Sequence, residues 1–197
     1  ASTLFINYVE ARDLKNINLP NIGYLSPLKK QQYEAKELGF EIPSNDKKKY
    51  EIVITSIPKS REEALGQVAR AYKNTKFGGV LILEGNKRNG IESILKILSK
   101  IVQIDYQTSK AHGKIAIIKV MSRRIGTFST WLDYSMPSKN KDGFFSMPGL
   151  FSYKNIDPAS QFLSLSFNDN LNGNIIDLGA GWGFLSSKLL KNCRNVK

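Results

Sequence analysis

One glycine-rich run constrains the fold of this chain more than any other feature. Residues 175–183 read Ile-Ile-Asp-Leu-Gly-Ala-Gly-Trp-Gly, so a β-branched pair and an acid precede three glycines at alternate positions. Apolar residues then recur at helical spacing: Phe184, Leu185, Leu189 and Leu190. This order predicts a buried strand, a tight turn and a helix start. Because glycine has no Cβ, a ligand can approach the backbone closely. The run therefore predicts a nucleotide-type ligand site at the carboxyl end of a strand.

The spacing of the glycines narrows the choice of ligand class. A dinucleotide-binding loop has the form G-x-G-x-x-G, and here the third position holds Phe184 while Gly183 comes one residue early. The form D-x-G-x-G-x-G instead resembles the first motif of class I S-adenosylmethionine-dependent methyltransferases. That cofactor has a sulfonium and an amino-acid end but no phosphate, so the acid at Asp177 suits its positive charge. A glycine-rich loop without a ligand is the alternative.

Charge and composition limit the partners. The 197 residues carry a formal net charge of +12, which favours a polyanion such as nucleic acid, although generic surface lysine is the plainer explanation. Cys193 and His112 are the only residues of their types, which excludes a disulfide framework and predicts no metal site. No apolar run approaches the length of a membrane span, and no secretory signal is visible. We expect a soluble, cytoplasmic monomer with no membrane partner.

The first part of the chain alternates strand and helix patterns. Ser60 is the expected N-cap of one helix, and Glu63 completes a capping box. The expected strands are 4–9, 40–42, 50–55, 80–84, 104–107 and 114–120, and the expected helices are 27–38, 62–72 and 91–101. Such alternation predicts an α/β fold, a Rossmann-like, mainly parallel sheet with helices on both faces. No helix separates the last two strands, so we expect them to pair antiparallel.

A change of composition predicts two domains. Residues 122–143 hold two prolines and several serines and are interpreted as a linker between a domain at 1–121 and a second at 144–197. In the second, a helix is expected at 158–167, with Phe162, Leu163 and Leu165 available for packing. The glycine run then follows Gly173.

Several motifs in order resemble a known family. Segment 144–190 looks like the start of the catalytic domain of the 16S ribosomal RNA guanine-N2 methyltransferases and their large-subunit relatives. The residues that carry the resemblance are Met147-Pro148-Gly149-Leu150-Phe151-Ser152, Asp157, Ser160-Gln161 and Asp177 to Gly183. Ala159 departs from the glycine usual before that serine.

The first domain also resembles that family, whose members carry a duplicated methyltransferase-like domain that has lost its cofactor site. The matching runs are Lys76 to Val80, Gly90 to Ser93 and Ser109 to Gly113. The turn Ser56-Ile57-Pro58-Lys59 lacks the asparagine and the ring of the family's Asn-Pro-Pro-aromatic turn. The only glycines before Tyr50 are Gly23 and Gly39, so no cradle precedes that strand.

The resemblance implies S-adenosylmethionine as cofactor and 16S rRNA, or the small ribosomal subunit, as partner. In the family a guanine leaves its stack and its exocyclic amine attacks the methyl group, held by the Asn-Pro-Pro-aromatic turn. This chain has no Pro-Pro pair and ends at Lys197, before the acid expected about twenty residues beyond the glycines. We therefore expect the amino-terminal part of such an enzyme, incomplete in its second domain, with no catalytic residue in the chain and no methyl transfer by the chain alone.

The candidate site residues form two sets. The cofactor-binding candidates are Asp177, Gly179, Gly181 and Gly183. Lysines and arginines on loops that follow strands could meet RNA phosphates, although solvated surface charge is the plainer interpretation. These RNA-binding candidates are Lys87, Arg88, Lys110, Lys114, Arg123 and Arg124.

Three other functions stay open. A large-subunit rRNA, adenine or tRNA methyltransferase shares the glycine motif. A non-catalytic RNA-binding or chaperone-like module would use the basic charge alone. The third alternative is a dinucleotide oxidoreductase, which is disfavoured because Phe184 stands where the motif needs glycine.

Overall fold

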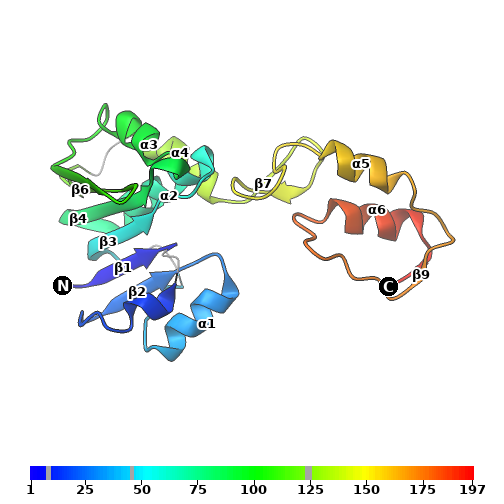
Figure 1. The fold of residues 1–197 in the computed structure, drawn as a ribbon, viewed down its shortest axis with the longest axis horizontal. Coiled ribbons are helices and arrows are strands. Elements are labelled where there is room, and N and C mark those ends of the chain that lie inside the picture. The colour runs from blue at the N-terminus through cyan, green and yellow to red at the C-terminus, as the bar shows by residue number, and fades with distance from the viewer. Residues whose placement is uncertain (8–9, 45–46, 123–125) are drawn as a thin grey trace. The chain divides into compact units, whose positions relative to one another are not determined.

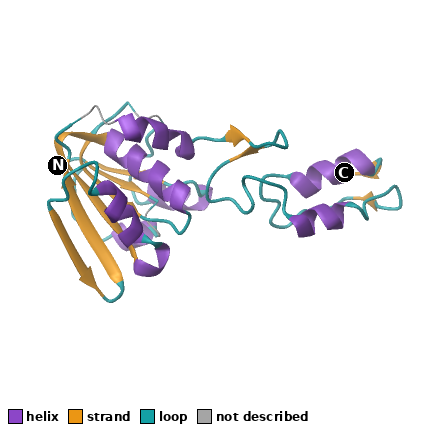
Figure 2. Ribbon diagram, turned by 90° about the horizontal axis from the view of Figure 1, so that it is seen from above, coloured by secondary structure: helices purple, strands orange, loops and turns teal. Residues whose placement is uncertain are grey.

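The chain folds into two compact units, Ala1–Ser135 and Met136–Lys197. The computed structural model describes residues 1–7, 10–44, 47–122 and 126–197. Figure 1 traces the elements along the chain, and Figure 2 shows strands gathered into one layer with helices against it in the first unit.

The first unit is built on a mainly parallel sheet. Its strands are β1 (Thr3–Ile6), β2 (Ile22–Leu25), β3 (Tyr50–Ser56), β4 (Thr75–Asn86), β5 (Tyr106–Lys110) and β6 (Gly113–Lys119). Among the described residues they lie in the order β2-β1-β3-β4-β6-β5, and from β2 to β6 this order can be followed upward in Figure 1. The pairs β1–β2, β1–β3 and β3–β4 are parallel, whereas β6 pairs antiparallel with both β4 and β5. The predicted α/β class and the antiparallel pairing of the last two strands are confirmed.

Both faces of this sheet carry a hydrophobic core. Along β1, Leu4 and Ile6 contribute to the core beneath the helices that follow β3 and β4, and Phe5 belongs to the core on the opposite face. This alternation follows from the two-residue repeat of a strand. The helices of the unit are η1 (Ala11–Leu14), α1 (Lys29–Glu37), α2 (Arg61–Asn74), η2 (Lys87–Asn89), α3 (Ile91–Leu98), α4 (Gly126–Leu132) and η3 (Asp133–Ser135).

Helix α2 begins where the sequence predicts. The Ser60 side chain accepts a hydrogen bond from the Glu63 amide at 3.5 Å, which is the expected N-cap contact. Ala64, Val68 and Ala69 are buried, so the helix packs on the sheet through the predicted face. The helix ends at Asn74, and the chain enters β4 at once.

Half of the segment expected as a linker is structured. Within 122–143, helix α4 places Phe128 and Trp131 in the core of the first unit, and the two rings lie 5.3 Å apart. Phe128 also contacts Tyr72 of α2, with ring centroids 4.4 Å apart. The polar composition hid this helix because only its i, i+3 aromatic pair is buried.

Several element boundaries differ from the expectation. Helix α1 begins at Lys29, so Pro27 precedes it rather than occupying its first turn. Gly78 and Gly79 lie inside β4, which extends from Thr75 to Asn86 and shifts register against β3. The expected strand 40–42 is reduced to one bridge between Glu41 and Gly23.

The second unit is small and has little sheet. Its elements are β7 (Ser138–Lys139), β8 (Phe145–Ser146), α5 (Pro158–Ser164), β9 (Asn172–Gly173), α6 (Phe184–Asn192) and β10 (Asn195–Val196). Helices α5 and α6 contact each other. Phe162 and Leu165, expected to be available for packing, are 78% exposed, and Leu163 is 50% exposed, so the described residues do not cover them.

The buried strand expected at Ile175 and Ile176 is not formed. Strand β9 covers Asn172–Gly173 and pairs in parallel with β10, the Lys197 amide donates to the Gly173 carbonyl, and the Ile175 amide donates to the Lys197 carbonyl. Ile176 is 81% exposed. Burial of a strand requires neighbours on its faces, and among the described residues the two-residue β10 is the one strand that pairs with β9.

Candidate functional site

The predicted glycine loop adopts a conformation that only glycine tolerates easily. Gly179, Gly181 and Gly183 have φ angles of 77°, 57° and 88°, in the left-handed region. A Cβ added at Gly179 or Gly183 would meet no atom within 4 Å. The turn conformation therefore explains why glycine stands at these positions. The loop leaves open space above its backbone, as a ligand cradle requires. Gly183 is the N-cap of α6, so the loop runs directly into a helix as predicted.

Asp177 stands half-buried at the entrance to this loop, and one of its oxygens is already engaged. Its Oδ2 accepts a hydrogen bond from the Ser186 hydroxyl in the first turn of α6. The carboxylate is thereby held on the side of the glycines. The other carboxylate oxygen, Oδ1, takes no part in this hydrogen bond.

Trp182 fastens the loop to a distant segment of the second unit. Its indole Nε1 donates to the Phe151 carbonyl at 3.1 Å. The Trp182 ring also packs 5.0 Å from Phe144 and 5.9 Å from Phe184, centroid to centroid. The loop is therefore attached at its tip to the segment around residue 150 and at its end to α6.

These contacts enclose a pocket of about 90 Å³ that contains most of the predicted cofactor set. Asp177, Gly179 and Gly181 line it, and Gly183 does not. Asp157 adds a second carboxylate, and its Oδ2 accepts from the Ser160 amide at 2.9 Å as the N-cap of α5. Two acids in the lining of one pocket of a strongly basic chain make a local attraction for a cation.

Sequence reasoning missed several residues of this pocket as site residues. Asp157 was singled out only as part of a motif, although an aspartate before Pro158 is a helix N-cap signal that would have placed it. Phe151 and Trp182 also lie within quoted motifs, but nothing local indicates the contact between them, which joins residues 31 apart. The missed lining residues are Phe151, Ser152, Asp157, Ser160, Ala180, Trp182, Phe184 and Leu185.

The predicted basic residues gather at one corner of the first unit. The Lys87 amide donates to the His112 carbonyl at 2.9 Å, which joins the loop after β4 to the turn between β5 and β6. Lys87 and Lys114 both approach Glu92, at 3.9 and 3.7 Å. Arg88 and Lys110 are exposed. The corner therefore concentrates positive charge, with Glu92 offsetting part of it.

Two predicted RNA-binding residues are not described by the structure. Arg123 and Arg124 lie outside the described residues. His112 takes a left-handed conformation, φ 65°, in the exposed turn beside the basic corner, together with Ala111 at φ 47°.

In the first unit, side chains fill the edge where open α/β sheets usually bind ligands. The chain leaves β1 toward β2 on one side and leaves β3 toward β4 on the other, so the point between β1 and β3 is the switch point. Gln67 from α2 occupies it. Its Nε2 donates to Thr55 Oγ1 at 2.6 Å and to the Ser56 carbonyl, and its Oε1 accepts from Asn7 Nδ2. Thr55 in turn donates to the Ile6 carbonyl at 3.1 Å.

Two kinds of feature are absent from the described residues. No group of three or more His, Cys, Asp or Glu side chains within residues 1–7, 10–44, 47–122 and 126–197 is placed to hold a metal ion. Across the same ranges, no helix combines the length and apolar character that a membrane crossing needs.

Comparison with protein families gives two matches that together cover most of the chain. Residues 11–124 match the family described as methyltransferase small domain N-terminal. Residues 142–197 match the family described as methyltransferase small domain. The first match alone covers more than half of the chain.

Individual relatives carry similar names. The chain is 30% identical to ribosomal RNA small subunit methyltransferase C of Buchnera aphidicola subsp. Cinara cedri, over 98% of this chain and 55% of the relative. It is 27% identical to the protein of that name from Psychromonas ingrahamii, over 85% of this chain and 49% of the relative. The chain thus spans about half the length of the curated relatives it matches.

A solved structure shares the fold. The T. thermophilus 16S rRNA N2 G1207 methyltransferase, in complex with AdoMet and guanosine, superposes with a TM-score of 0.73 at 18% identity. The match covers 100% of this chain and 57% of that one. It agrees with the Rossmann-like fold predicted from the sequence.

Proposed function

This chain belongs to the family described as methyltransferase small domain N-terminal, and we propose that the whole protein transfers a methyl group from S-adenosylmethionine to a guanine exocyclic amine of 16S rRNA. The observation that carries the proposal is the pocket of the second unit, in which Asp177 and Asp157 stand beside the glycine loop. The relatives' names and the structural neighbour's complex with AdoMet and guanosine support the same chemistry.

The residues present fit this cofactor. A Cβ placed on Gly179 or Gly183 would have no atom within 4 Å, so nothing in the loop opposes a close ligand. Asp177 and Asp157 suit the positive charges of the methionine ammonium and the sulfonium, and exposed backbone amides suit its carboxylate. S-adenosylmethionine supplies an electrophilic methyl group on sulfur. The chain's own contribution is to hold the cofactor's amino-acid end through Asp177, Gly179 and Gly181, while Gly183 ends the loop as the N-cap of α6.

The two units have different roles in this proposal. The first is a methyltransferase-like domain without a cofactor, because the Gln67 network occupies its switch point and Asn7, rather than a glycine loop, follows β1. The second begins the cofactor-binding domain. The boundaries proposed from sequence, 1–121 and 144–197, fall within the two compact units Ala1–Ser135 and Met136–Lys197.

The first unit contributes RNA contacts. Lys87, Arg88, Lys110 and Lys114 come together at one corner, and Arg123 and Arg124 remain candidates from sequence. Cationic side chains position RNA through its phosphates and lose affinity as salt rises. The partner is 16S rRNA or the small ribosomal subunit. The protein acts on it in the cytoplasm, as a monomer with no membrane association.

The decisive experiment measures cofactor binding and methyl transfer separately. S-adenosylmethionine titrated into residues 1–197 in a calorimeter should give saturable binding that Asp177→Asn weakens at least about ten-fold. The whole protein should transfer labelled methyl from the cofactor to small-subunit rRNA. Binding of a nicotinamide dinucleotide in place of S-adenosylmethionine would instead favour an oxidoreductase.

A further inference from the structure

A tryptophan stands inside the glycine loop of the second unit. Trp182 lies between Gly181 and Gly183, whose φ angles of 57° and 88° are left-handed. Glycine loses more conformational freedom than any other residue when its backbone is fixed, so a loop with three glycines is costly to order. A pocket built on such a loop keeps its shape before a ligand arrives only if other contacts hold the loop.

Trp182 supplies such contacts in two ways. Its ring lies 5.0 Å from that of Phe144 and 5.9 Å from that of Phe184, the first residue of α6, between centroids. The Phe144 and Phe184 rings are themselves 6.3 Å apart, so the three rings form one cluster. The indole has a single N–H, and Nε1 donates it to the Phe151 carbonyl at 3.1 Å. Ring packing therefore anchors the loop, and the hydrogen bond ties it to the backbone at residue 151.

This hydrogen bond reaches a strained part of the backbone. Ser152 has φ 48°, a left-handed conformation that residues other than glycine rarely adopt. Gly149, three residues earlier, has φ 97°. Residues in such conformations persist where the surrounding structure holds them. The Phe151 carbonyl belongs to the peptide group that leads into Ser152, so the Trp182 N–H fixes the backbone at the point of strain.

The two segments that Trp182 joins line the same pocket. Phe151 and Ser152 contribute to the lining from the turn at 149–152, and Gly179 and Gly181 contribute from the loop. Trp182 itself also belongs to the lining. The hydrogen bond therefore sets the spacing between two parts of the pocket wall, and without it the wall loses this cross-link.

We propose that Trp182 is a positioning residue of the cofactor pocket, whose N–H holds residues 149–152 against the glycine loop and thereby raises the affinity for S-adenosylmethionine. The inference rests on the proposed function and deepens it. Trp182 acts through the backbone at Phe151 and Ser152. A pocket that already has its bound shape loses less conformational freedom when the ligand enters, and its affinity is higher for that reason.

Trp182→Phe in the whole protein tests the proposal, because it keeps an aromatic ring against Phe144 and Phe184 and removes the N–H. Titration calorimetry should show S-adenosylmethionine binding about five-fold weaker, as expected for the loss of one hydrogen bond between neutral groups. In methyl transfer, the KM for the cofactor should rise by the same factor while kcat stays unchanged. Affinity equal to that of the parent protein would overturn the proposal.

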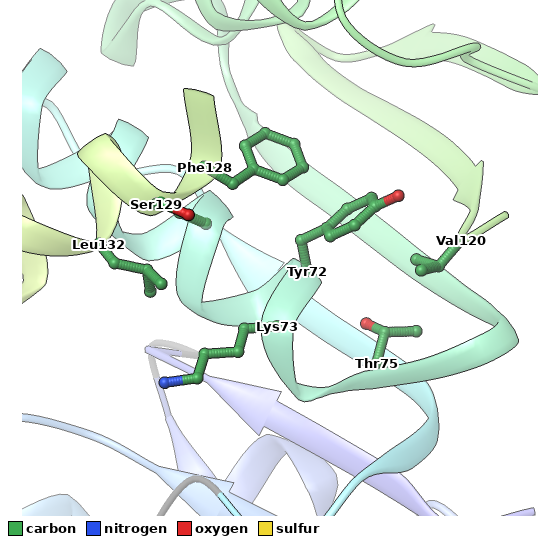
Figure 3. A pocket seen from close by; sticks show the side chains of 8 residues that line it. Tyr72, Lys73, Thr75, Val120, Phe128, Ser129 and Leu132 are labelled. Carbon is green, nitrogen blue, oxygen red and sulfur yellow. The ribbon is translucent and has the colours of Figure 1, made fainter. Parts of the chain in front are cut away.

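Trp131→Phe is the matched control. The sequence has two tryptophans, and this substitution makes the same chemical change on α4 of the first unit. Trp131 packs on Phe128, whose ring Figure 3 shows beside Tyr72, and it does not line the cofactor pocket. Cofactor affinity should not change in this variant. An equal loss of affinity in both variants would trace the effect to general destabilisation and would contradict the proposal.

Hydrogen exchange in the free protein gives a readout that does not involve the cofactor. The amides of Leu150 and Asn155 donate to backbone carbonyls three residues earlier, so their exchange reports whether the turn is formed. In Trp182→Phe both should exchange at least about three-fold faster, and saturating S-adenosylmethionine should restore the parent rate. In Trp131→Phe both should exchange at the parent rate. Unchanged exchange in Trp182→Phe would show that the N–H does not hold the turn, and the proposal would fall.

The two sets of results separate this inference from the proposed function. If the whole protein binds S-adenosylmethionine and Trp182→Phe changes neither affinity nor exchange, the positioning role alone is wrong. If the whole protein binds no S-adenosylmethionine and Trp182→Phe still loosens the turn, the proposed cofactor is wrong and Trp182 remains the residue that holds this pocket in shape.

Discussion

The hydroxyl of Ser186 donates a hydrogen bond to Oδ2 of Asp177 over 2.6 Å, from the first turn of α6 back to the residue that precedes the glycine loop. This contact fixes the carboxylate before any ligand arrives. A pre-oriented acid loses less conformational freedom on binding than a mobile one, and the cofactor gains affinity accordingly.

We therefore expect Ser186→Ala to weaken S-adenosylmethionine binding about ten-fold, or about 1.4 kcal/mol, through the loss of a hydrogen bond to a charged group. Titration calorimetry measures the effect. Ser187→Ala is the control, because Ser187 is the next residue, is exposed and does not line the pocket. Equal affinities in the two variants would show that Ser186 has no part in positioning Asp177.

Gly179→Ala should lower cofactor affinity more than it lowers stability. A side chain at φ 77° costs about 1–2 kcal/mol, and its Cβ would enter the open space of the pocket. Gly173→Ala is the matched control, with φ 87° and open surroundings but no place in the pocket lining. Denaturation should show similar destabilisation of the two variants, with cofactor binding lost only at Gly179. Loss of binding in both would trace the effect to strain.

The basic corner should reveal itself through the salt dependence of RNA binding. Arg88→Ala and Lys110→Ala should each weaken affinity for small-subunit RNA and reduce the slope of log affinity against log salt by about 1. Glu92→Gln should strengthen binding, because it removes the acid that pairs with Lys87 and Lys114. Lys29→Ala on α1 is the control. A slope that no substitution at the corner changes would remove these residues from the interface.

Gln67→Leu should destabilise the protein by about 2–4 kcal/mol, since Thr55 and Asn7 lose their partner in a buried network. Chemical denaturation measures the loss. Gln103→Leu, at an exposed position, makes the same chemical change with little expected effect. If Gln67→Leu were neutral, the network would have no share in holding β1 against β3.

The stability of the first unit should depend on the titration of Glu63. Burial raises the pKa of this carboxyl above its ordinary value, so folding favours the protonated form. The contribution of Glu63 to the free energy of unfolding is therefore fully present below the ordinary pKa of the carboxyl. It is lost as pH rises through the higher pKa of the folded state. Glu63→Gln should therefore stabilise the protein at neutral pH and make no difference near pH 3, by urea denaturation at each. A loss of stability on Glu63→Gln at neutral pH would contradict this expectation.

The strands of the first unit could be predicted because the local residue pattern already indicates that they are buried. The apolar runs that form β3 and β4 have neighbours on both sides, and the alternation of Leu4, Phe5 and Ile6 serves two cores. Ile175 and Ile176 have the same local character, yet the described chain supplies no cover for Ile176. Composition predicts the tendency to form a strand, whereas burial depends on partners that a local window does not contain.

The site shows the same division. Asp177 and its glycines could be predicted because turn chemistry and charge lie within one short run. The contacts of Trp182 with Phe151 and of Ser186 with Asp177 depend on how the loop and α6 pack in three dimensions, which a short stretch of sequence does not show. Helix α4 was missed for a similar reason, since Phe128 and Trp131 are recognisable as core residues only beside Tyr72.

The place of β1 inside the sheet has a consequence for synthesis. Thr3–Ile6 leave the ribosome first among the described strands, but β1 lies between β2 and β3, and β3 begins only at Tyr50. The emerging chain must carry the apolar Leu4, Phe5 and Ile6 uncovered until both neighbours have been made. Long-range parallel pairing of this kind closes slowly. The β1–β3 pair therefore forms late in synthesis, and β1 stays exposed on that side until β3 has emerged.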